Sequence, residues 1–208
     1  FNSGGEGSGM YVSHDGGDTW KKRTDEDGLP KGNLGRMGLA ISASNPKICY
    51  ALVEAKEIAL YKSTDGGFNW KKKATDNAGN RPLYYADIFV NPHDAKEVWS
   101  LWSVVSRSDD GGSTFQTVIP YSGVHPDHHA FWISPTDPNF MMDGNDGGLN
   151  ISRDGGNTWQ YVSNLPLGQF YHINYDMDIP YHVYGGMQDN GSWQGPGYKW
   201  GWNSISNE

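Results

Sequence analysis

The sequence predicts an all-β protein in which four-stranded antiparallel sheets are arranged as the blades of a β-propeller. Three observations predict this fold class: 28 glycines beside 9 tryptophans and 12 tyrosines in 208 residues, four gapless copies of one short motif, and apolar runs separated by turn residues. Many glycines together with many aromatic residues are typical of short strands joined by tight turns. A chain of this length can also bury a substantial core.

The repeated motif has the pattern Ser-x-Asp-x-Gly-x-Thr-Trp. Its copies occupy residues 13–20, 63–70, 108–115 and 152–159, and Asn69 and Phe115 are the only departures from the pattern. They begin 44 to 50 residues apart, which is close to the period of four-stranded propeller blades. We call these four segments the repeat turns.

Each repeat turn is expected to join the last two strands of a sheet. The aspartate accepts hydrogen bonds from turn amides, glycine supplies a positive φ, and the final aromatic ring packs over the hairpin. A single carboxylate per turn is a poor cage for calcium, which takes roughly six to eight oxygens. The residues therefore predicted to be structural are Asp15, Trp20, Asp65, Trp70, Asp110, Phe115, Asp154 and Trp159.

The apolar runs around the repeat turns divide the chain into sheets, whose strands we letter A to D from channel to rim. Strands C and D are expected in 1–34, complete sheets in 35–78, 79–122 and 123–166, and strands A, B and part of C in 167–208. This predicts a partial propeller with three full blades and a half-blade at each end. The alternative is a small ring closed by the two ends, but no fifth motif follows residue 195. In a partial propeller, the rest of the propeller or other chains must cover the exposed strand edges.

The net charge limits the possible partners, and the cysteine content limits the possible disulfides. The formal net charge is −8 and the basic residues are scattered apart from 71–73, so nucleic acid is not an expected partner. The single cysteine, Cys49, excludes an internal disulfide and is interpreted as a small buried residue. No apolar run reaches the ~20 residues of a membrane span. The chain opens without a signal peptide, and we expect it to be a mature or excised fragment.

The repeat turns resemble the Asp-box, or bacterial neuraminidase, repeats of sialidases, xyloglucan-cleaving glycoside hydrolases, sortilin-type receptors and photosystem assembly factors. Segments 35–38, 124–130, 144–148 and 185–193 extend the resemblance to secreted bacterial proteins described as sortilin-like or glycosyl-hydrolase-like repeat proteins. The resemblance covers almost the whole chain. It implies a propeller fold and a secreted, periplasmic or cell-surface location, but no activity, because Asp boxes occur on enzymes and on binding proteins.

The polar motifs outside the repeat turns all fall on loops from strand D to A or from strand B to C. These loops open at one end of the sheets, and the repeat turns lie at the other. We therefore expect a ligand at the channel mouth formed by those loops. The predicted ligand-binding residues are Arg36, Arg81, Tyr84, Tyr85, His125, His128, His129, Tyr171, His172, Gln188, Asn190 and Trp193.

Segment 124–130 is the most specific of these motifs. If it is extended, His125, Asp127 and His129 point to one side and His128 to the other. Two imidazoles and one carboxylate on one side would suit zinc or another transition metal, and no other cofactor is expected. The alternatives are a hydrogen-bonded structural network and direct contact with a ligand. This segment is expected to lie close to Asp146.

Two functions from different classes remain open. One is binding of a protein or glycan at the channel mouth, and the other is hydrolysis of a polysaccharide. A glycosidase needs two carboxyl groups roughly 5 to 9 Å apart, and Asp127, Asp146 and Asp189 are the candidates by loop position. Asp146 and Asp189 are alternatively turn residues beside glycines. The arginines do not form a triad of the sialidase kind, so sialidase activity is not expected.

Overall fold

The structure is a computed structural model that describes residues 3–79, 83–85, 87–165, 167–199 and 201–206. The chain divides into two compact units, Phe1–Tyr161 and Val162–Glu208. Apart from a 3-10 turn, η1 (Asp25–Asp27), the regular secondary structure of the described residues is β-strand. In this part of the chain, no helix is long and apolar enough to cross a membrane.

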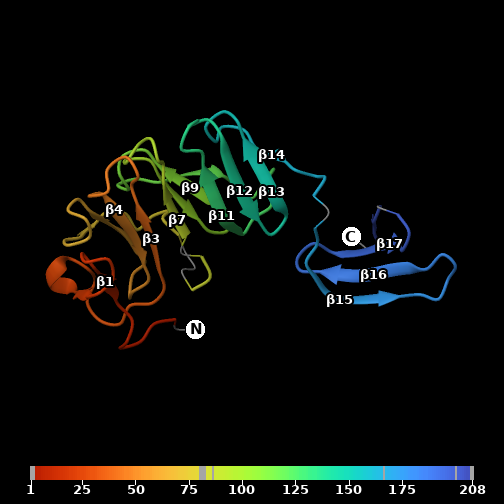
Figure 1. Cartoon of the computed structure of the whole chain (residues 1–208), viewed down its shortest axis with the longest axis horizontal. Helices are drawn as coiled ribbons and strands as arrows, with labels where there is room; N and C mark the ends of the chain where they lie inside the picture. The colour runs from red at the N-terminus through yellow and green to blue at the C-terminus, as the bar shows by residue number, and fades with distance from the viewer. Residues whose placement is uncertain (1–2, 80–82, 86, 166, 200, 207–208) are drawn as a thin grey trace. The chain divides into compact units, whose positions relative to one another are not determined.

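The first unit contains one two-stranded and three four-stranded antiparallel sheets (Figure 1). In every sheet, consecutive strands pair with each other. The strands are β1 (Met10–Val12) and β2 (Lys21–Arg23); β3 (Met37–Ile41), β4 (Cys49–Val53), β5 (Ala59–Ser63) and β6 (Lys71–Lys72); β7 (Asp87–Val90), β8 (Val98–Leu101), β9 (Val105–Ser108) and β10 (Gln116–Ile119); β11 (His128–Ile133), β12 (Met141–Asn145), β13 (Gly148–Ser152) and β14 (Gln160–Tyr161). The predicted all-β blade architecture is confirmed.

The second unit is one four-stranded sheet of β15 (Phe170–Tyr175), β16 (His182–Met187), β17 (Ser192–Pro196) and β18 (Asn203–Ser204). The sequence predicts only strands A, B and part of C here, because the motif is missing. The last hairpin nevertheless forms, because β17 pairs with β18. Its loop contacts the loop between β15 and β16, where Gly197 N donates to Tyr181 O at 3.0 Å. Gly66 N makes the equivalent bond to Lys47 O at 2.9 Å from within a repeat turn. The backbone contact is therefore kept without the Ser and Asp side chains.

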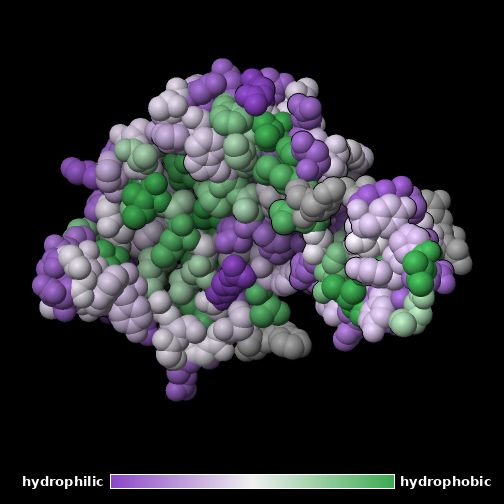
Figure 2. All heavy atoms as spheres, turned by 45° about the vertical axis from the view of Figure 1, so that its right-hand side comes forward, coloured by the Kyte–Doolittle hydropathy of each residue, from purple (hydrophilic) through white to green (hydrophobic). Residues whose placement is uncertain are grey.

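Successive sheets of the first unit pack through three apolar cores. The first joins Met10 and Leu34 to Tyr61 of β5, the second joins Leu52 of β4 to Ile88 of β7, and the third spans the sheets of β7–β10 and β11–β14. Burying such side chains is worth roughly 1.5 to 3 kcal/mol each. Figure 2 shows apolar side chains gathered over the middle of one face of this unit, with hydrophilic side chains along its upper edge.

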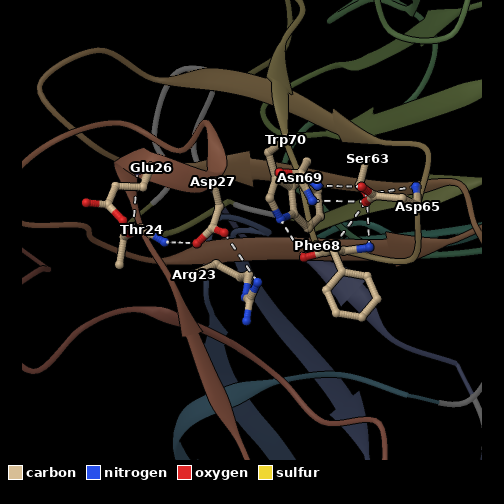
Figure 3. Close-up of polar contacts among 10 residues, drawn as sticks. Arg23, Thr24, Glu26, Asp27, Ser63, Asp65, Phe68, Asn69 and Trp70 are labelled. Atoms are coloured by element: carbon tan, nitrogen blue, oxygen red, sulfur yellow. Dashed lines mark hydrogen bonds and ion pairs between the residues drawn. The ribbon is translucent and has the colours of Figure 1, made fainter.

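Each repeat turn is closed by its own side chains. In the second, Asp65 Oδ1 accepts from Ser63 Oγ at 2.7 Å and Asn69 N at 2.9 Å, and Gly67 N donates to Ser63 Oγ at 2.9 Å (Figure 3). Trp70 Nε1 donates to Gly67 O at 3.0 Å. Gly67 has φ 91°, which a residue with a Cβ rarely adopts. The same Ser, Asp and Gly contacts recur in the other three turns.

The aromatic rings of the repeat turns differ in burial. Trp70 is 5% exposed and Phe115 7%, Trp159 is partly buried, but Trp20 is 61% exposed. The expectation that each ring is buried by its own hairpin is therefore wrong for Trp20. The reason is that Trp70 and Phe115 lie in cores shared with the preceding sheet, whereas no described sheet precedes β1. The turn supplies the hydrogen bond, and the neighbouring sheet supplies the burial.

Hydrogen bonds also stabilise the charged form of the repeat-turn carboxyls. The side chain and amide of Asn69 lower the pKa of Asp65 to about 2, and those of Thr158 do the same for Asp154. Burial raises the pKa of Asp110, but the hydrogen bonds from Thr114, Ser108 and Ser113 together outweigh burial and bring the pKa to about 2. The pKa of Asp15 is lowered in the same way.

These lowered pKa values predict an acid-sensitive fold. A carboxyl whose folded pKa is depressed contributes its stability above the unfolded pKa of about 4 and loses it as the pH falls through about 2. We expect the melting temperature to fall between pH 4 and pH 2, and the Asp65→Asn variant to show a weaker fall together with a lower melting temperature at pH 7. Calorimetry across this pH range measures both. A variant with the wild-type pH dependence would contradict this role of Asp65.

Candidate functional site

In the first unit, the antiparallel order places the predicted site loops at one end of the sheets. Met37 pairs with Val53 at one end of the first complete sheet, and Cys49 pairs with Ser63 at the other. The repeat turns lie at the Ser63 end. The second, third and fourth repeat turns contact the loop between the first two strands of their sheets through Gly66, Gly111 and Gly155. The innermost strands β3, β7 and β11 lie side by side and begin at the opposite end.

Arg36 connects the first of these loops to the next sheet. Its backbone N–H donates to Glu54 Oε2 at 3.0 Å. Its guanidinium donates from Nη1 to Tyr84 O at 2.9 Å, and Nη2 lies 3.7 Å from Asp87 Oδ1. The charged head of Arg36 therefore holds the loop that leads into β7.

Tyr85 and Asp127 connect the second sheet to the third. The Tyr85 hydroxyl donates to Asp127 Oδ1, and the ring is 1% exposed. Asp127 has φ 65°, a left-handed conformation that turns the chain just before β11. Asp146 N donates to Asp127 O at 3.2 Å, so the two aspartates lie beside each other, as the sequence predicts.

His129 contacts the residues of the two preceding loops. Its Nε2 lies 3.4 Å from Asp146 Oδ1, and its ring centroid lies 5.2 Å from Tyr84, edge to face, and 5.5 Å from Tyr85, stacked. We call Arg36, Tyr84, Tyr85, Asp127, His129 and Asp146 the loop belt, because their contacts run without a break across three sheets.

The loop belt is accessible to solvent. Tyr84 is 41% exposed, and the side chains of Arg36, His129 and Asp146 are 43%, 36% and 19% exposed. Tyr85 lies beneath them and holds Asp127 in place. The arrangement offers ring faces, carboxylates and a guanidinium to a ligand, on a base of packed side chains.

His128 is predicted to bind a ligand, but the structure buries it completely. Its Nδ1 lies 2.8 Å and 2.9 Å from the two carboxylate oxygens of Asp143, which is also fully buried. Asn145 Nδ2 donates to Asp143 Oδ2 at 2.9 Å. Successive strand residues face opposite sides, so His128 points into the packed interior and His129 toward the loop belt. The pairing of Asp143 with His128 was not predicted from the sequence. The sequence does place this carboxylate directly after the apolar run 140–142, which would have indicated an unusual buried charge.

The predicted metal set of His125, Asp127 and His129 does not form. The ligand atoms of the three residues do not all lie within 4.8 Å of one another. The metal prediction assumed that segment 124–130 is extended. Asp127 has a positive φ, so the chain turns at this residue and is not extended there. His125 instead places Nδ1 3.0 Å from Pro126 O and lies against Gly147, where a Cβ would meet its ring.

Asp176, Asp178 and His182 do bring their ligand atoms within 4.8 Å, in the second unit. This group was not predicted, although the sequence places three residues of metal-ligating types within the seven positions 176–182. Asp176 accepts from the N–H groups of Asp178 and His182, from His182 Nδ1 and from the Tyr184 hydroxyl. These bonds, that of the His182 amide first, lower the pKa of Asp176 to about 2. The carboxylate thus organises the loop between β15 and β16.

Four of the predicted residues of the second unit lie in the hairpin between β16 and β17: Gln188, Asp189, Asn190 and Trp193. Asn190 Nδ2 donates to Gln188 O at 2.9 Å, Trp193 Nε1 donates to Asn190 O at 2.7 Å, and Asp189 has φ 52°. Asp189 is therefore a turn residue here. Tyr171 is 64% exposed, and His172 lines an open cavity of about 340 Å³ on the sheet of this unit. Arg81 lies outside the described residues.

No protein-family model matches this chain, and no curated protein matches its sequence. Among solved structures, it is similar to the GH74 enzyme of Niastella koreensis, with 17% identity over 99% of this chain and 38% of that one, at a TM-score of 0.52. It is also similar to YCF48 bound to D1 peptide, with 14% identity over 91% of this chain and 59% of that one, at a TM-score of 0.52. The chain thus spans less than two thirds of either structure. Both are β-propeller proteins, and at these identities the likeness shows the fold alone: this chain is a partial β-propeller of antiparallel blades.

Proposed function

We propose that this chain binds a macromolecular ligand, protein or glycan, through the loop belt. The observation that carries the proposal is the unbroken series of contacts from Arg36 through Tyr84 and Tyr85 to Asp127, Asp146 and His129. Three sheets contribute to one accessible surface, and a rigid scaffold of this kind presents loop side chains in fixed positions. Tyrosine and arginine are also the residue types that dominate binding surfaces.

The two similar structures differ in what their descriptions name. One is a GH74 enzyme, and the other is bound to a D1 peptide. We further propose that the repeat turns are Asp boxes of secreted, sortilin-like or glycosyl-hydrolase-like repeat proteins, and that the chain acts at the cell surface, in the periplasm or outside the cell. The blades would then be 35–78, 79–122, 123–166 and 167–208, with the strand edges of 1–34 covered by the rest of the propeller or by other chains.

A second candidate function is glycoside hydrolysis, favoured by the placement of Asp127 and Asp146 side by side. Asp127 accepts a hydrogen bond from Tyr85, and Asp146 lies beside the imidazole of His129. Two carboxyl groups in different surroundings are the arrangement that divides acid and base roles in glycosidases. The third predicted carboxylate, Asp189, belongs to the turn between β16 and β17, where it has φ 52°.

An array of immobilised glycans and peptides tests the proposal. We expect wild-type binding to at least one ligand to weaken about tenfold in Tyr84→Ala and in Asp127→Asn, as is typical of a binding residue at the centre of an interface. Asp109→Asn is the matched control, because Asp109 is an exposed carboxylate within the third repeat turn and outside the loop belt. Binding that survives both belt substitutions would exclude the loop belt as the binding site. Turnover of a bound glycan that is abolished in Asp127→Asn or Asp146→Asn would establish the hydrolase instead.

A further inference from the structure

The loop between β15 and β16 is closed by the same backbone hydrogen bond as the corresponding loops of the first unit. In each four-stranded sheet, the loop that joins the first two strands contains an amide that donates to the carbonyl six residues later. The pairs are Ser42 with Ile48, Asn91 with Glu97, Ser134 with Phe140, and Asp176 with His182, at 3.0, 3.0, 2.9 and 3.2 Å. Two of these loops begin with serine and one with asparagine, so closing the loop does not require a carboxylate at its first position.

The β15–β16 loop places metal-ligating side chains at three positions that this closure brings together. They are Asp176, Asp178 and His182, the first, third and seventh residues of the loop, and their ligand atoms all lie within 4.8 Å of one another. The same positions hold serine, serine and isoleucine between β3 and β4, and serine, threonine and phenylalanine between β11 and β12. The two carboxylates and the imidazole are therefore particular to this loop and are not needed for its backbone fold.

The loop between β7 and β8 shows how similar residue types behave when their role is structural. It holds Asn91, His93 and Glu97 at the three positions. There Asn91 Nδ2 donates to Glu97 Oε1 at 2.8 Å, and His93 Nε2 lies 2.9 Å from Ser134 O in the next sheet. In the β15–β16 loop, by comparison, the carboxylate of Asp178 is exposed and accepts no hydrogen bond from the residues that the structure describes.

The distances in the group suit a small divalent transition-metal ion. His182 Nδ1 lies 3.1 Å from Asp176 Oδ2. Two ligand atoms that are each about 2.0 to 2.1 Å from a tetrahedral zinc ion lie about 3.4 Å apart. Small side-chain movements would therefore bring both atoms to one ion. An imidazole nitrogen together with carboxylate oxygens favours zinc over calcium, which takes roughly six to eight oxygens.

The group is both held in place and open to solvent. Asp176 accepts from the amides of Asp178 and His182 at 3.1 and 2.9 Å and from the Tyr184 hydroxyl at 2.7 Å. Donors of this kind orient a carboxylate that binds a metal. The side chains of Asp176 and His182 are 25% and 33% exposed, so an ion can reach them from solvent.

We propose that Asp176, Asp178 and His182 bind a zinc ion. The ion ties the two carboxylates to the imidazole at the start of β16, and its fourth coordination position is left to water. The site lies within the second unit and does not depend on the loop belt.

Isothermal titration of the full chain with zinc chloride tests this site, with calcium chloride as the comparison probe. We expect one zinc ion to bind per chain and calcium to bind more weakly. Asp178→Asn and His182→Ala should each weaken zinc binding about tenfold or more, since even the loss of a hydrogen-bond partner of a ligand costs about 10- to 100-fold in affinity. Asp137→Asn is the control, because Asp137 is an exposed carboxylate in the corresponding β11–β12 loop, and it should leave the affinity unchanged.

Melting curves recorded without zinc establish that each variant is folded, and Asp178→Asn keeps every hydrogen bond described for the loop. Zinc binding of unchanged affinity in Asp178→Asn and His182→Ala would place the ion on other residues and overturn the proposal. Equal weakening by Asp137→Asn would mean that zinc responds to overall charge. Tighter binding of calcium than of zinc, or no binding of zinc at about 1 mM, would also contradict the site. None of these results bears on the loop belt, so the proposed function is tested separately.

Discussion

Replacing Trp70 with alanine lowers the free energy of unfolding by about 3 to 5 kcal/mol, the usual cost of removing a large buried aromatic side chain. The ring is 5% exposed and packs in the core that joins the β1–β2 hairpin to the next sheet, with Met10, Leu29 and Leu34. Its Nε1 also donates to Gly67 O, and that acceptor would lose its partner. Urea denaturation followed by tryptophan fluorescence measures the change.

Trp20 provides the matched control for this substitution. It occupies the same position in its repeat turn and makes the same bond, from Nε1 to Gly17 O at 3.0 Å, but it is 61% exposed. We expect Trp20→Ala to cost less than about 1 kcal/mol, because an exposed ring loses little contact area. Equal costs for the two substitutions would show that the turn itself, and not the neighbouring sheet, stabilises the ring.

Replacing His128 with alanine is expected to lower the free energy of unfolding by about 3 to 5 kcal/mol, because it leaves a buried carboxylate without its cationic or hydrogen-bonding partner. Asp143 is fully buried, and among the described residues Asn145 Nδ2 would be its remaining side-chain donor. Asp143→Asn should cost much less, since the amide oxygen can still accept from His128 Nδ1. Chemical denaturation of both variants measures the difference.

His129 is the control for His128, one residue along the same strand. Its side chain is 36% exposed, so His129→Ala should change the free energy of unfolding by less than about 1 kcal/mol. The double variant His128→Ala/Asp143→Ala should lose less free energy of unfolding than the sum of the losses in His128→Ala and in Asp143→Ala. The reason is that the double variant also removes the unpaired charge. Additive losses would mean that the two side chains do not stabilise each other.

The repeat turns and the order of the strands could be predicted because they depend on interactions over short distances in the sequence. The side-chain hydrogen bonds that close a repeat turn lie within eight residues, from Ser63 to Trp70 in the second copy. Each sheet pairs consecutive strands, so the alternation of apolar runs and turns also determines which strands are neighbours. The same topology predicts that the loops of Arg36, Tyr84 and Asp127 share one end of the sheets.

Two details of the loop belt could not be predicted in this way. An extended strand would place Asp127 and His129 on one side, but the left-handed φ of Asp127 breaks the alternation, and a non-glycine residue in that conformation has no reliable sequence signal. The pairing of His128 with Asp143 depends on a cross-strand contact between positions 15 residues apart. Neither side chain indicates by itself whether it faces solvent or core.

The sequence by itself determined much of the local geometry of this protein: four repeat turns, the meander of the three complete sheets of the first unit, and the end of those sheets at which the polar loops gather. Only the tertiary structure decided which of the similar side chains are buried and which are accessible. Trp20 and Trp70 make the same local bond, yet only Trp70 is covered, because burial depends on a neighbouring sheet. Likewise, the hairpin at Gly197 forms without the motif, because its backbone bond to Tyr181 requires the adjacent loop and no particular side chain. Hydrogen bonds within a turn are encoded locally, whereas packing is a property of segments distant in the sequence.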